Sequence, residues 1–517
     1  MRRIALLLLV LAAVPARAQT APPEGFDARL AADVYTRALA FMAPRILEPI
    51  PVPQLATWGL RGLTALDPEL GTAVSGTGLV LNLRDRIVAA DPLPANATPE
   101  AWGNAAARMA AAAWPVSAAV RRAGTEGIIQ SFFDEMFNHL DPYSRYVGPV
   151  DAREDREHRG GKAGAGLTLA RRGSAIIVIG AIPDGAGADA GLRAGDRILA
   201  VDGQSTRGRD AATVSGWMDG PEGTTVEIEW RGRNGGTRRA EMERASVPPE
   251  TVFAQRYGGL LLLRVTSFSR RTDQRIAAEV ERNLAPPAGH GSRPMQGLIL
   301  DLRGNRGGLL RQAVTVADVL LPEGIVATTA GRDPEASRVW RSTGAEMAPG
   351  IPVVVIVDGR TASAAEILAA ALADRGRAVV IGSSTLGKGL VQTIDPLPDG
   401  GELFVTWSRV LAPRGWPIQG LGVLPQVCTS LGEGELAREM AELDAGRQPM
   451  AAALARHERA RAPLPVAEIL AIRGTCPASE GRESDLATAR ALIGNPGAYA
   501  TALLPPLLNL QANPTQP

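Results

Sequence analysis

The spacing of apolar and polar residues changes twice along the chain. Residues 28–149 contain alanine-rich amphipathic stretches interrupted by prolines, a pattern with the period of a helix. A charged and then glycine-rich stretch at 152–161 is predicted to be a linker. The following residues, 164–245, form short apolar runs separated by Gly, Asp and Pro, which predicts a compact β-rich module. From Thr251 onward apolar strands alternate with amphipathic helices, which predicts a sheet covered by helices.

Beyond about residue 429 the chain is rich in Ala, Glu and Arg, and it is predicted to be helical before a proline-rich tail. Together these patterns predict a multidomain α/β protein with helical regions at both ends. The predicted segments are a leader at 1–18, an N-terminal helical region at 19–157, a β-rich domain at 158–245, an α/β core at 246–430 and a C-terminal helical extension at 431–517.

The N-terminus has the three parts of a secretory signal. Two arginines precede an apolar run at 4–14, and the small residues Ala16 and Ala18 form a cleavage site before Gln19. The run is too short to cross a membrane, and no later run reaches the ~18 apolar residues that a spanning helix needs. We therefore expect an exported, periplasmic bacterial protein without a membrane span after signal cleavage. An uncleaved N-terminal anchor is the alternative.

The composition excludes some classes of partner. The formal net charge of the 517 residues is +1, with acidic and basic residues intermixed, so the chain lacks the basic footprint of a nucleic-acid-binding protein. No spacing of Cys and His indicates a metal site, and no cofactor is expected. Cys428 and Cys476, the two cysteines of the chain, either form one disulfide or remain two buried thiols.

Two turns of the α/β core carry residues suited to acyl transfer. Ser363 follows an apolar strand and begins a helix, where N–H groups can face negative charge, although serine is also an ordinary N-cap. Lys388 lies in a glycine turn after the next strand, in a chain that otherwise uses arginine almost throughout. Unlike arginine, a buried lysine can lose its proton. Because no histidine lies between His290 and His457, a Ser-Lys pair explains the site without a distant histidine.

The turn around Lys388 also nearly matches a phosphate-binding loop. That loop requires Ser or Thr after the lysine to ligate magnesium, and here the position is Gly389. Export would also separate the protein from nucleotides, so we do not expect nucleotide binding.

The order of several short blocks resembles the carboxyl-terminal processing peptidases, also called tail-specific proteases. The blocks cover roughly residues 124–427. They include LDPYSRYVGP, GAGLTLA, IPDGAGADAGLRAGDRILAVDG, LLLLRVTSFS, GLILDLRGNRGGLLRQAVTVADVLLP, ASAAEILAAALADRGRAVVIG, TLGKGLVQ and APRGWPIQGLGVLPQV. The resemblance implies that residues 158–245 form a PDZ domain and that residues 246–430 form an α/β peptidase core.

Carried over residue by residue, the resemblance implies a serine endopeptidase with a Ser-Lys dyad. Ser363 matches the nucleophile, Lys388 matches the general base, and Gln392 matches the residue that orients the lysine. Small residues, Ala362 and Ala365, flank Ser363 where the family often has serine. Because small residues still fit a tight turn, this departure does not put the expected activity in doubt.

The resemblance also implies an oxyanion-binding region. The Ala364 N–H and an N–H of the glycine turn at 304–308 match it, with Gly307 favoured over Gly308. Glu366 matches the acid that follows the nucleophile, and we expect it to have a structural role.

The PDZ-like segment implies capture of a substrate's free C-terminus by strand addition. The residues assigned to tail binding are Gly164, Ala165, Gly166, Leu167 and Leu169. Expected partners are polypeptides with apolar C-termini, with a periplasmic adaptor or activator and a homo-oligomer as further possibilities. The alternative function is a catalytically inactive periplasmic PDZ adaptor that binds C-terminal tails.

Overall fold

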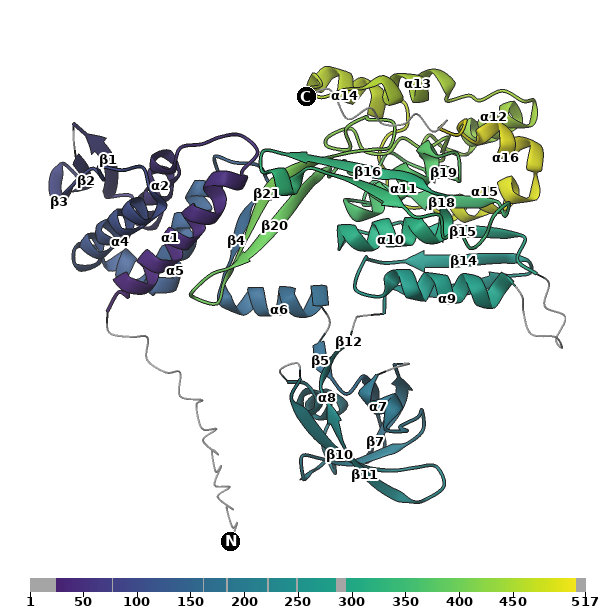
Figure 1. The fold of residues 1–517 in the computed structure, drawn as a ribbon, viewed down its shortest axis with the longest axis horizontal. Coiled ribbons are helices and arrows are strands. Elements are labelled where there is room, and N and C mark those ends of the chain that lie inside the picture. Colours follow the sequence, from purple (N-terminus) through teal and green to yellow (C-terminus); the bar gives the residue numbers. More distant parts are fainter. Residues whose placement is uncertain are drawn as a thin grey trace, which may run out of the picture. The chain divides into compact units, whose positions relative to one another are not determined.

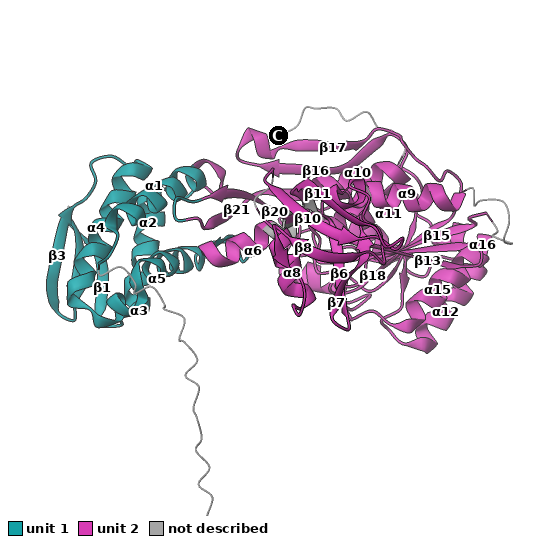
Figure 2. Ribbon diagram, turned by 90° about the horizontal axis from the view of Figure 1, so that it is seen from below, with its two compact units in different colours: residues 1–43, 50–146, 397–399 teal, residues 44–49, 147–396, 400–517 magenta. Residues whose placement is uncertain are grey.

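A computed structural model of the protein describes residues 25–76, 78–160, 162–182, 185–220, 223–247, 250–284 and 294–507 (Figure 1). The predicted leader at 1–18 lies outside these residues. The chain divides into two compact units, coloured separately in Figure 2. Unit 1 comprises the described residues up to Ala43, Ile50–Tyr146 and Leu397–Asp399, and unit 2 comprises Pro44–Pro49, Val147–Pro396 and the described residues from Gly400 onward.

Unit 1 combines helices with a small sheet. Its helices are α1 (Ala28–Arg45, which runs two residues into unit 2), α2 (Val52–Leu60), α3 (Gly62–Leu66), α4 (Pro99–Val116) and α5 (Ala118–Phe137). An antiparallel sheet of β1 (Leu70–Ser75), β2 (Gly78–Leu83) and β3 (Arg86–Pro92) interrupts them. The helical pattern did not predict this sheet. Two tight turns produce it, and buried Leu79 and Leu81 anchor its middle strand to the helices.

The segment predicted as a linker is mostly helical. After β4 (Arg145–Val147), helix α6 (Pro149–Gly160) covers most of residues 152–161. Acidic and basic residues dominate α6, a composition that suits a solvent-exposed helix as well as a linker. The linker prediction was therefore wrong for most of this stretch.

A β-rich module follows, as the apolar pattern predicted. Its sheet has the strand order β11-β10-β8-β7-β6, so β6 lies at one edge. Buried apolar side chains from the sheet and from α8, among them Ile176, Val178 and Val214, form its core. The elements are β5 (Lys162–Gly164), β6 (Leu167–Arg172), β7 (Ala175–Ala181), α7 (Ala186–Asp189), β8 (Arg197–Val201), β9 (Gln204–Ser205), α8 (Ala211–Met218), β10 (Thr225–Arg231), β11 (Thr237–Glu243) and β12 (Ala245–Val247).

The α/β core is organised around a sheet of six strands. Its strand order is β13 (Val252–Tyr257), β14 (Leu260–Val265), β15 (Gly297–Asp301), β18 (Val353–Val357), β19 (Val379–Gly382) and β22 (Val427–Cys428). The first two strands are antiparallel, and all the later pairs are parallel. Both faces of the parallel strands are buried, as expected when helices cover both sides.

Alternate residues of this sheet face two different helical layers. One layer consists of α9 (Thr272–Leu284), α10 (Leu310–Leu320) and α11 (Ala364–Asp374). The other face, which includes Val354, Ile356 and Ile381, packs against C-terminal helices. The helices that cover this face are α12 (Glu433–Asp444), α15 (Glu483–Gly494) and α16 (Pro496–Ala502). The other two C-terminal helices, α13 (Ala451–Arg459) and α14 (Val466–Arg473), contribute buried residues to the cluster that includes α9, α10 and α11.

A second sheet of the core has the order β17 (Arg338–Ser342), β16 (Gly324–Gly331), β21 (Glu402–Leu411) and β20 (Leu390–Pro396). A short 3-10 helix, η1 (Pro334–Ala336), lies between β16 and β17.

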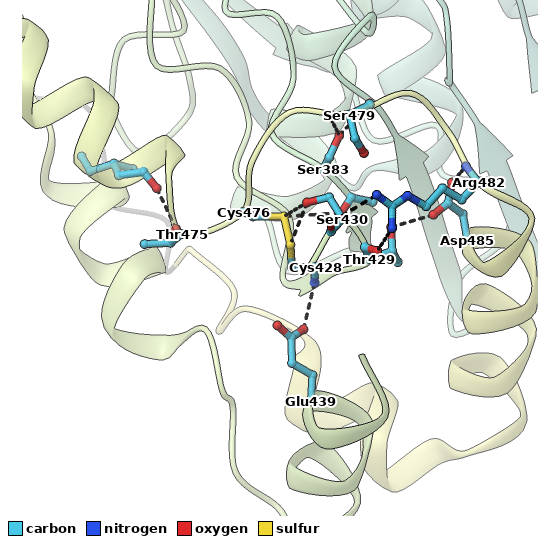
Figure 3. The surroundings of a disulfide bond; sticks show 12 residues. Ser383, Cys428, Thr429, Ser430, Glu439, Thr475, Cys476, Ser479, Arg482 and Asp485 are labelled. Atoms are coloured by element: carbon cyan, nitrogen blue, oxygen red, sulfur yellow. Dashed lines mark hydrogen bonds between the residues drawn. A yellow bond between two sulfur atoms is a disulfide. The ribbon is translucent and has the colours of Figure 1, made fainter. Parts of the chain in front are cut away.

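Cys428 and Cys476 form a disulfide in which the two Cα atoms are 5.7 Å apart (Figure 3). Of the two possibilities that the sequence left open, the structure contains the disulfide. In the part of the chain that the structure describes, we find no helix long and apolar enough to cross a membrane.

Candidate active site

Ser363 occupies a sharp turn between strand β18 and helix α11. It is the residue before Ala364, the first residue of the helix, and its backbone has φ 57° and ψ −119°. Few non-glycine residues adopt a positive φ, and such strain persists only where the surroundings enforce it. The Ser363 side chain is half-buried rather than enclosed. This strand-to-helix turn therefore holds a partly accessible hydroxyl at a fixed point.

The carboxylate of Glu366 connects the Ser363 turn to the Lys388 loop. One of its oxygens, Oε2, accepts hydrogen bonds from the Ser363 N–H at 2.8 Å and from the Lys388 N–H at 2.9 Å. The other, Oε1, accepts from the Gly387 N–H at 2.7 Å and from the Thr385 hydroxyl. Glu366 is fully buried, and burial raises the pKa of its carboxyl group while these four donors lower it. A single buried side chain thus holds the backbones of both predicted catalytic residues.

The Lys388 loop also packs directly on its neighbours. The Leu386 N–H donates to Thr361 O at 2.9 Å, which adds a second link to the Ser363 turn. On the other side, the Gly420 N–H donates to Gly387 O, also at 2.9 Å. Lys388 itself is half-buried. The loop is therefore fixed from two sides, and the lysine backbone has a defined position.

Asn305 braces the glycine turn against Ser363, and the sequence did not single it out. Its side chain donates to Val265 O and accepts from the Gly307 N–H, both at 2.8 Å, and its own carbonyl accepts from the Ala362 N–H at 2.9 Å. Asn305 is fully buried. A Cβ added to Gly307 would lie 2.7 Å from Ser363 Cβ, so only glycine fits beside the nucleophile candidate. The one available signal was an amide residue inside a glycine-rich turn, directly after Gly304.

Which backbone N–H groups near Ser363 are free to bind an oxyanion differs from the sequence-based expectation at one residue. Gly307 was favoured from the sequence, but its N–H donates to Asn305. In the described part of the chain, the N–H groups of Ala364 and Gly308 have no hydrogen-bond partner. Gly308 is exposed, with φ 138°. Gly308 and Ala364 are therefore donors beside Ser363 that remain open to a ligand.

A buried ion-pair network fixes the start of the glycine turn. Arg303 donates to both carboxylate oxygens of Asp301, at 2.8 and 2.7 Å, and also to Asp485 at 3.1 Å. Asp301 is only 2% exposed, so this is not an ordinary surface pair. The hydrogen bond to Asp301 raises the pKa of Arg303, and the guanidinium stays charged.

Gln392 lies on β20, four residues after the lysine. Its side-chain nitrogen donates to Thr406 Oγ1 at 3.0 Å, across the pairing of β20 with β21, and to Leu390 O at 3.3 Å. These bonds fix the amide plane of Gln392. Its predicted contact with Lys388 remains a prediction.

The tail-binding candidates lie at one edge of the β-rich module, on β5, on β6 and in the loop between them. Gly166 has φ 71°, which turns the chain into β6. On its other side, β6 pairs with β7 from Leu167 to Arg172, and α8 packs nearby. Leu167 and Leu169 are partly buried against the core of the module. An open strand edge beside a helix suits the addition of a peptide strand.

Two family models and several known proteases match parts of the chain. Residues 259–429 match the model of peptidase family S41, and residues 177–232 match the model of the PDZ domain. The carboxy-terminal-processing protease of Bartonella bacilliformis is 32% identical over 305 residues, which cover 58% of this chain and 69% of that protein. The carboxy-terminal processing protease CtpA of Bacillus subtilis is 30% identical over 308 residues, covering 59% of this chain and 63% of that protein.

Among solved structures, a photosystem II D1 C-terminal processing protease is 29% identical, with a TM-score of 0.33; the match covers 62% of this chain and 86% of that one. The two family models and the Bartonella relative confirm the expected fold class, with a PDZ domain and an α/β peptidase core. The chain belongs to the carboxy-terminal-processing proteases of peptidase family S41, which are serine-type peptidases with a PDZ domain.

Proposed function

We propose that this protein is an exported, periplasmic endopeptidase that captures apolar C-terminal tails with its PDZ domain and cleaves with a Ser363–Lys388 dyad. The observation that carries the proposal is the Glu366 carboxylate, one oxygen of which accepts the N–H of both residues. This contact supports the proposal because it links the backbone of the strained serine turn to that of Lys388, the one lysine among the described residues of the peptidase core.

In the proposed reaction, Ser363 Oγ attacks the carbonyl carbon of the scissile peptide while Lys388 Nζ takes the hydroxyl proton. The tetrahedral intermediate collapses, the C–N bond breaks, and the ammonium of Lys388 gives its proton to the leaving amine. Water then attacks the acyl-enzyme, with Lys388 again accepting a proton, and Ser363 recovers its hydrogen as the acid product leaves. Gln392 holds the lysine side chain in line with Ser363.

The N–H groups of Ala364 and Gly308 are the proposed oxyanion donors. Both are open, and Gly308 replaces Gly307 in this role because the Gly307 N–H is bonded to Asn305. One such donor is typically worth about 3 kcal/mol of transition-state stabilisation. The N-terminal end of α11 adds the favourable field of a helix dipole.

For recognition, a substrate tail is proposed to add as a strand to the open edge of β6. Its terminal carboxylate accepts N–H groups of the loop that contains Gly164, Ala165 and Gly166. Leu167 and Leu169 contact the last apolar side chain. Activity and binding therefore reside in different parts of the chain and can be separated by mutation.

The test is a cleavage assay with a protein substrate ending in apolar residues, and a matched substrate ending in Asp. Wild-type protein should cleave the first and bind it more tightly than the second. Ser363→Ala should abolish cleavage while tail binding persists. Lys388→Arg keeps the positive charge but cannot supply a neutral amine, so it should lower kcat by at least about a thousandfold.

Two outcomes would contradict the proposal. Activity retained in Lys388→Arg would remove the lysine from proton transfer. Tail binding without any cleavage by the wild type would instead favour the inactive adaptor. Export is tested separately: the N-terminal residue of the protein recovered from the periplasm should be Gln19.

A further inference from the structure

A segment after α14 crosses the end of the peptidase sheet at which the candidate active site lies. We call residues 476–482 the C-terminal strap. It contains no helix or strand, and it contacts the carboxyl ends of β22, β19, β18 and β15 in the order in which these strands lie in the sheet. The strap lies outside residues 259–429, the part that matches the peptidase family.

The first contacts of the strap are with the loop that carries Lys388. The Ser384 N–H donates to Cys476 O at 3.3 Å. Ser383 makes a reciprocal pair, since its hydroxyl donates to Ser479 O and accepts the Ser479 N–H, both at 3.1 Å (Figure 3). Ser383 is 2% exposed, so water cannot easily replace these bonds.

The next contacts are with the turn that carries Ser363. The Gly359 N–H donates to Ser479 O at 2.8 Å, and the Gly481 N–H donates to Asp358 Oδ2 at 3.3 Å. A Cβ added to Gly359 would lie 3.2 Å from Ala478 Cβ, so the two backbones are tightly packed. Ser479 O thus accepts from both catalytic loops, from Ser383 on one side and Gly359 on the other.

The last contact reaches the glycine turn. Arg303, whose guanidinium is paired with Asp301 at the end of β15, donates to Arg482 O at 2.7 Å. The strap therefore bonds to all three turns that form the candidate active site.

The disulfide fixes the beginning of the strap. Cys476 is its first residue, and Cys428 is the last residue of β22; both are fully buried. A segment without regular structure loses much conformational entropy when it is ordered, and a covalent link removes part of that cost. The strap's place thus depends on the disulfide and on a small number of hydrogen bonds.

We propose that the C-terminal strap is a positioning element that aligns the serine turn, the lysine loop and the glycine turn, and that the Cys428–Cys476 disulfide holds it in place. Ser383 is the side chain through which the strap fixes the lysine loop. The expected consequence is that breaking the disulfide lowers kcat in a protein that is still folded. This kinetic consequence rests on the proposed function, whereas the structural one does not.

The first experiment compares the wild type with Cys428→Ala/Cys476→Ala in the full-length mature protein, below the onset of thermal unfolding measured by circular dichroism. We expect kcat on the apolar-tailed substrate to fall at least about tenfold and KM to stay within about twofold, because tail capture by the PDZ domain is unaffected. Thr475→Val is the matched control: it removes a hydroxyl bond to Ile472 O beside the disulfide, and among the described residues that hydroxyl has no hydrogen bond to the three turns. Its kcat should equal that of the wild type.

The second experiment uses Ser383→Ala and amide hydrogen exchange, and it does not require activity. Exchange should accelerate in residues 358–363 and 383–389 of Ser383→Ala and of the cysteine variant, but not in the PDZ domain. Ser383→Thr, which keeps the hydroxyl, should restore slow exchange. If the cysteine variant does not fold, Ser383→Ala and wild-type protein reduced with a phosphine decide the question in its place.

The proposal is overturned if folded, disulfide-free protein keeps kcat within twofold of the wild type, or if exchange in the two loops is unchanged. A fall in thermal stability alone, with normal kcat, would assign the strap a merely structural role and would also overturn it. If the wild type itself cleaves nothing, the proposed function fails, and the exchange experiment still decides the positioning role.

Discussion

Replacing Glu366 by glutamine should impair catalysis and stability together. The substitution keeps the size of the side chain but leaves one oxygen in place of two. Each oxygen of Glu366 accepts two hydrogen bonds, so glutamine can retain two of the four. The other two donors then face an NH₂ group in a site that is fully buried.

The size of the effect follows from these contacts. Hydrogen bonds to a charged group contribute about 1.5–3 kcal/mol each, and two are lost. Removing a buried charge recovers part of this because desolvation of the carboxylate no longer opposes folding. We expect the free energy of unfolding to fall by about 3 kcal/mol. Misalignment of Ser363 and Lys388 should lower kcat by about ten- to a hundredfold.

The assay is urea unfolding together with steady-state kinetics at pH 7. Glu69→Gln provides the control, because Glu69 is half-exposed and its carboxylate pairs with Arg84 at the surface of unit 1; we expect it to change stability by less than about 1 kcal/mol. If Glu366→Gln has the same stability and kcat as the wild type, the carboxylate is already protonated or does not hold the two loops. Either result would refute the reasoning.

Two further predictions concern the same helix and its neighbours. Gly307→Ala should lower kcat at least about a hundredfold, because the new Cβ would meet Ser363 Cβ at 2.7 Å; near-normal kcat would contradict this contact. Asp374, at the end of α11, accepts the Arg414 N–H and the Trp416 indole N–H, and burial raises its pKa to about 7. Because the folded state holds this proton more tightly, the free energy of unfolding should fall by about 3 kcal/mol as pH rises from about 4 to 7. In Asp374→Asn, urea unfolding should give nearly the same free energy of unfolding at the two pH values. If this variant still loses stability between them, other groups cause the fall.

The sequence predicted the parts of the site that depend on local pattern. Apolar strands followed by a serine turn and a glycine turn made Ser363 and Lys388 candidates, because the carboxyl ends of parallel strands meet at one edge of a sheet. Their catalytic roles came from the family resemblance and remain predictions. Open N–H groups and buried braces could not be predicted in this way. Asn305 binds Val265, which lies 40 residues earlier, and no local pattern reveals a partner at that distance.

Errors in the predicted fold have similar causes. Short strands between long helices, at Leu70–Ser75 and beyond, were missed because a brief alternation is hard to distinguish from helical spacing. A charged stretch was interpreted as a linker, although charge is equally compatible with an exposed helix such as α6. The pairing of Cys428 with Cys476 depends on a fold that brings residues 48 positions apart together.

The C-terminal helices have a consequence for how this chain can be shortened. The family match ends at residue 429, yet the sheet face that includes Val354, Ile356 and Ile381 is covered by helices beyond that point. A chain truncated at the family boundary would expose a broad apolar surface to water and should aggregate rather than fold. The evolutionary unit and the folding unit of this peptidase therefore differ in length. Any minimal fragment has to retain the helices through Ala502.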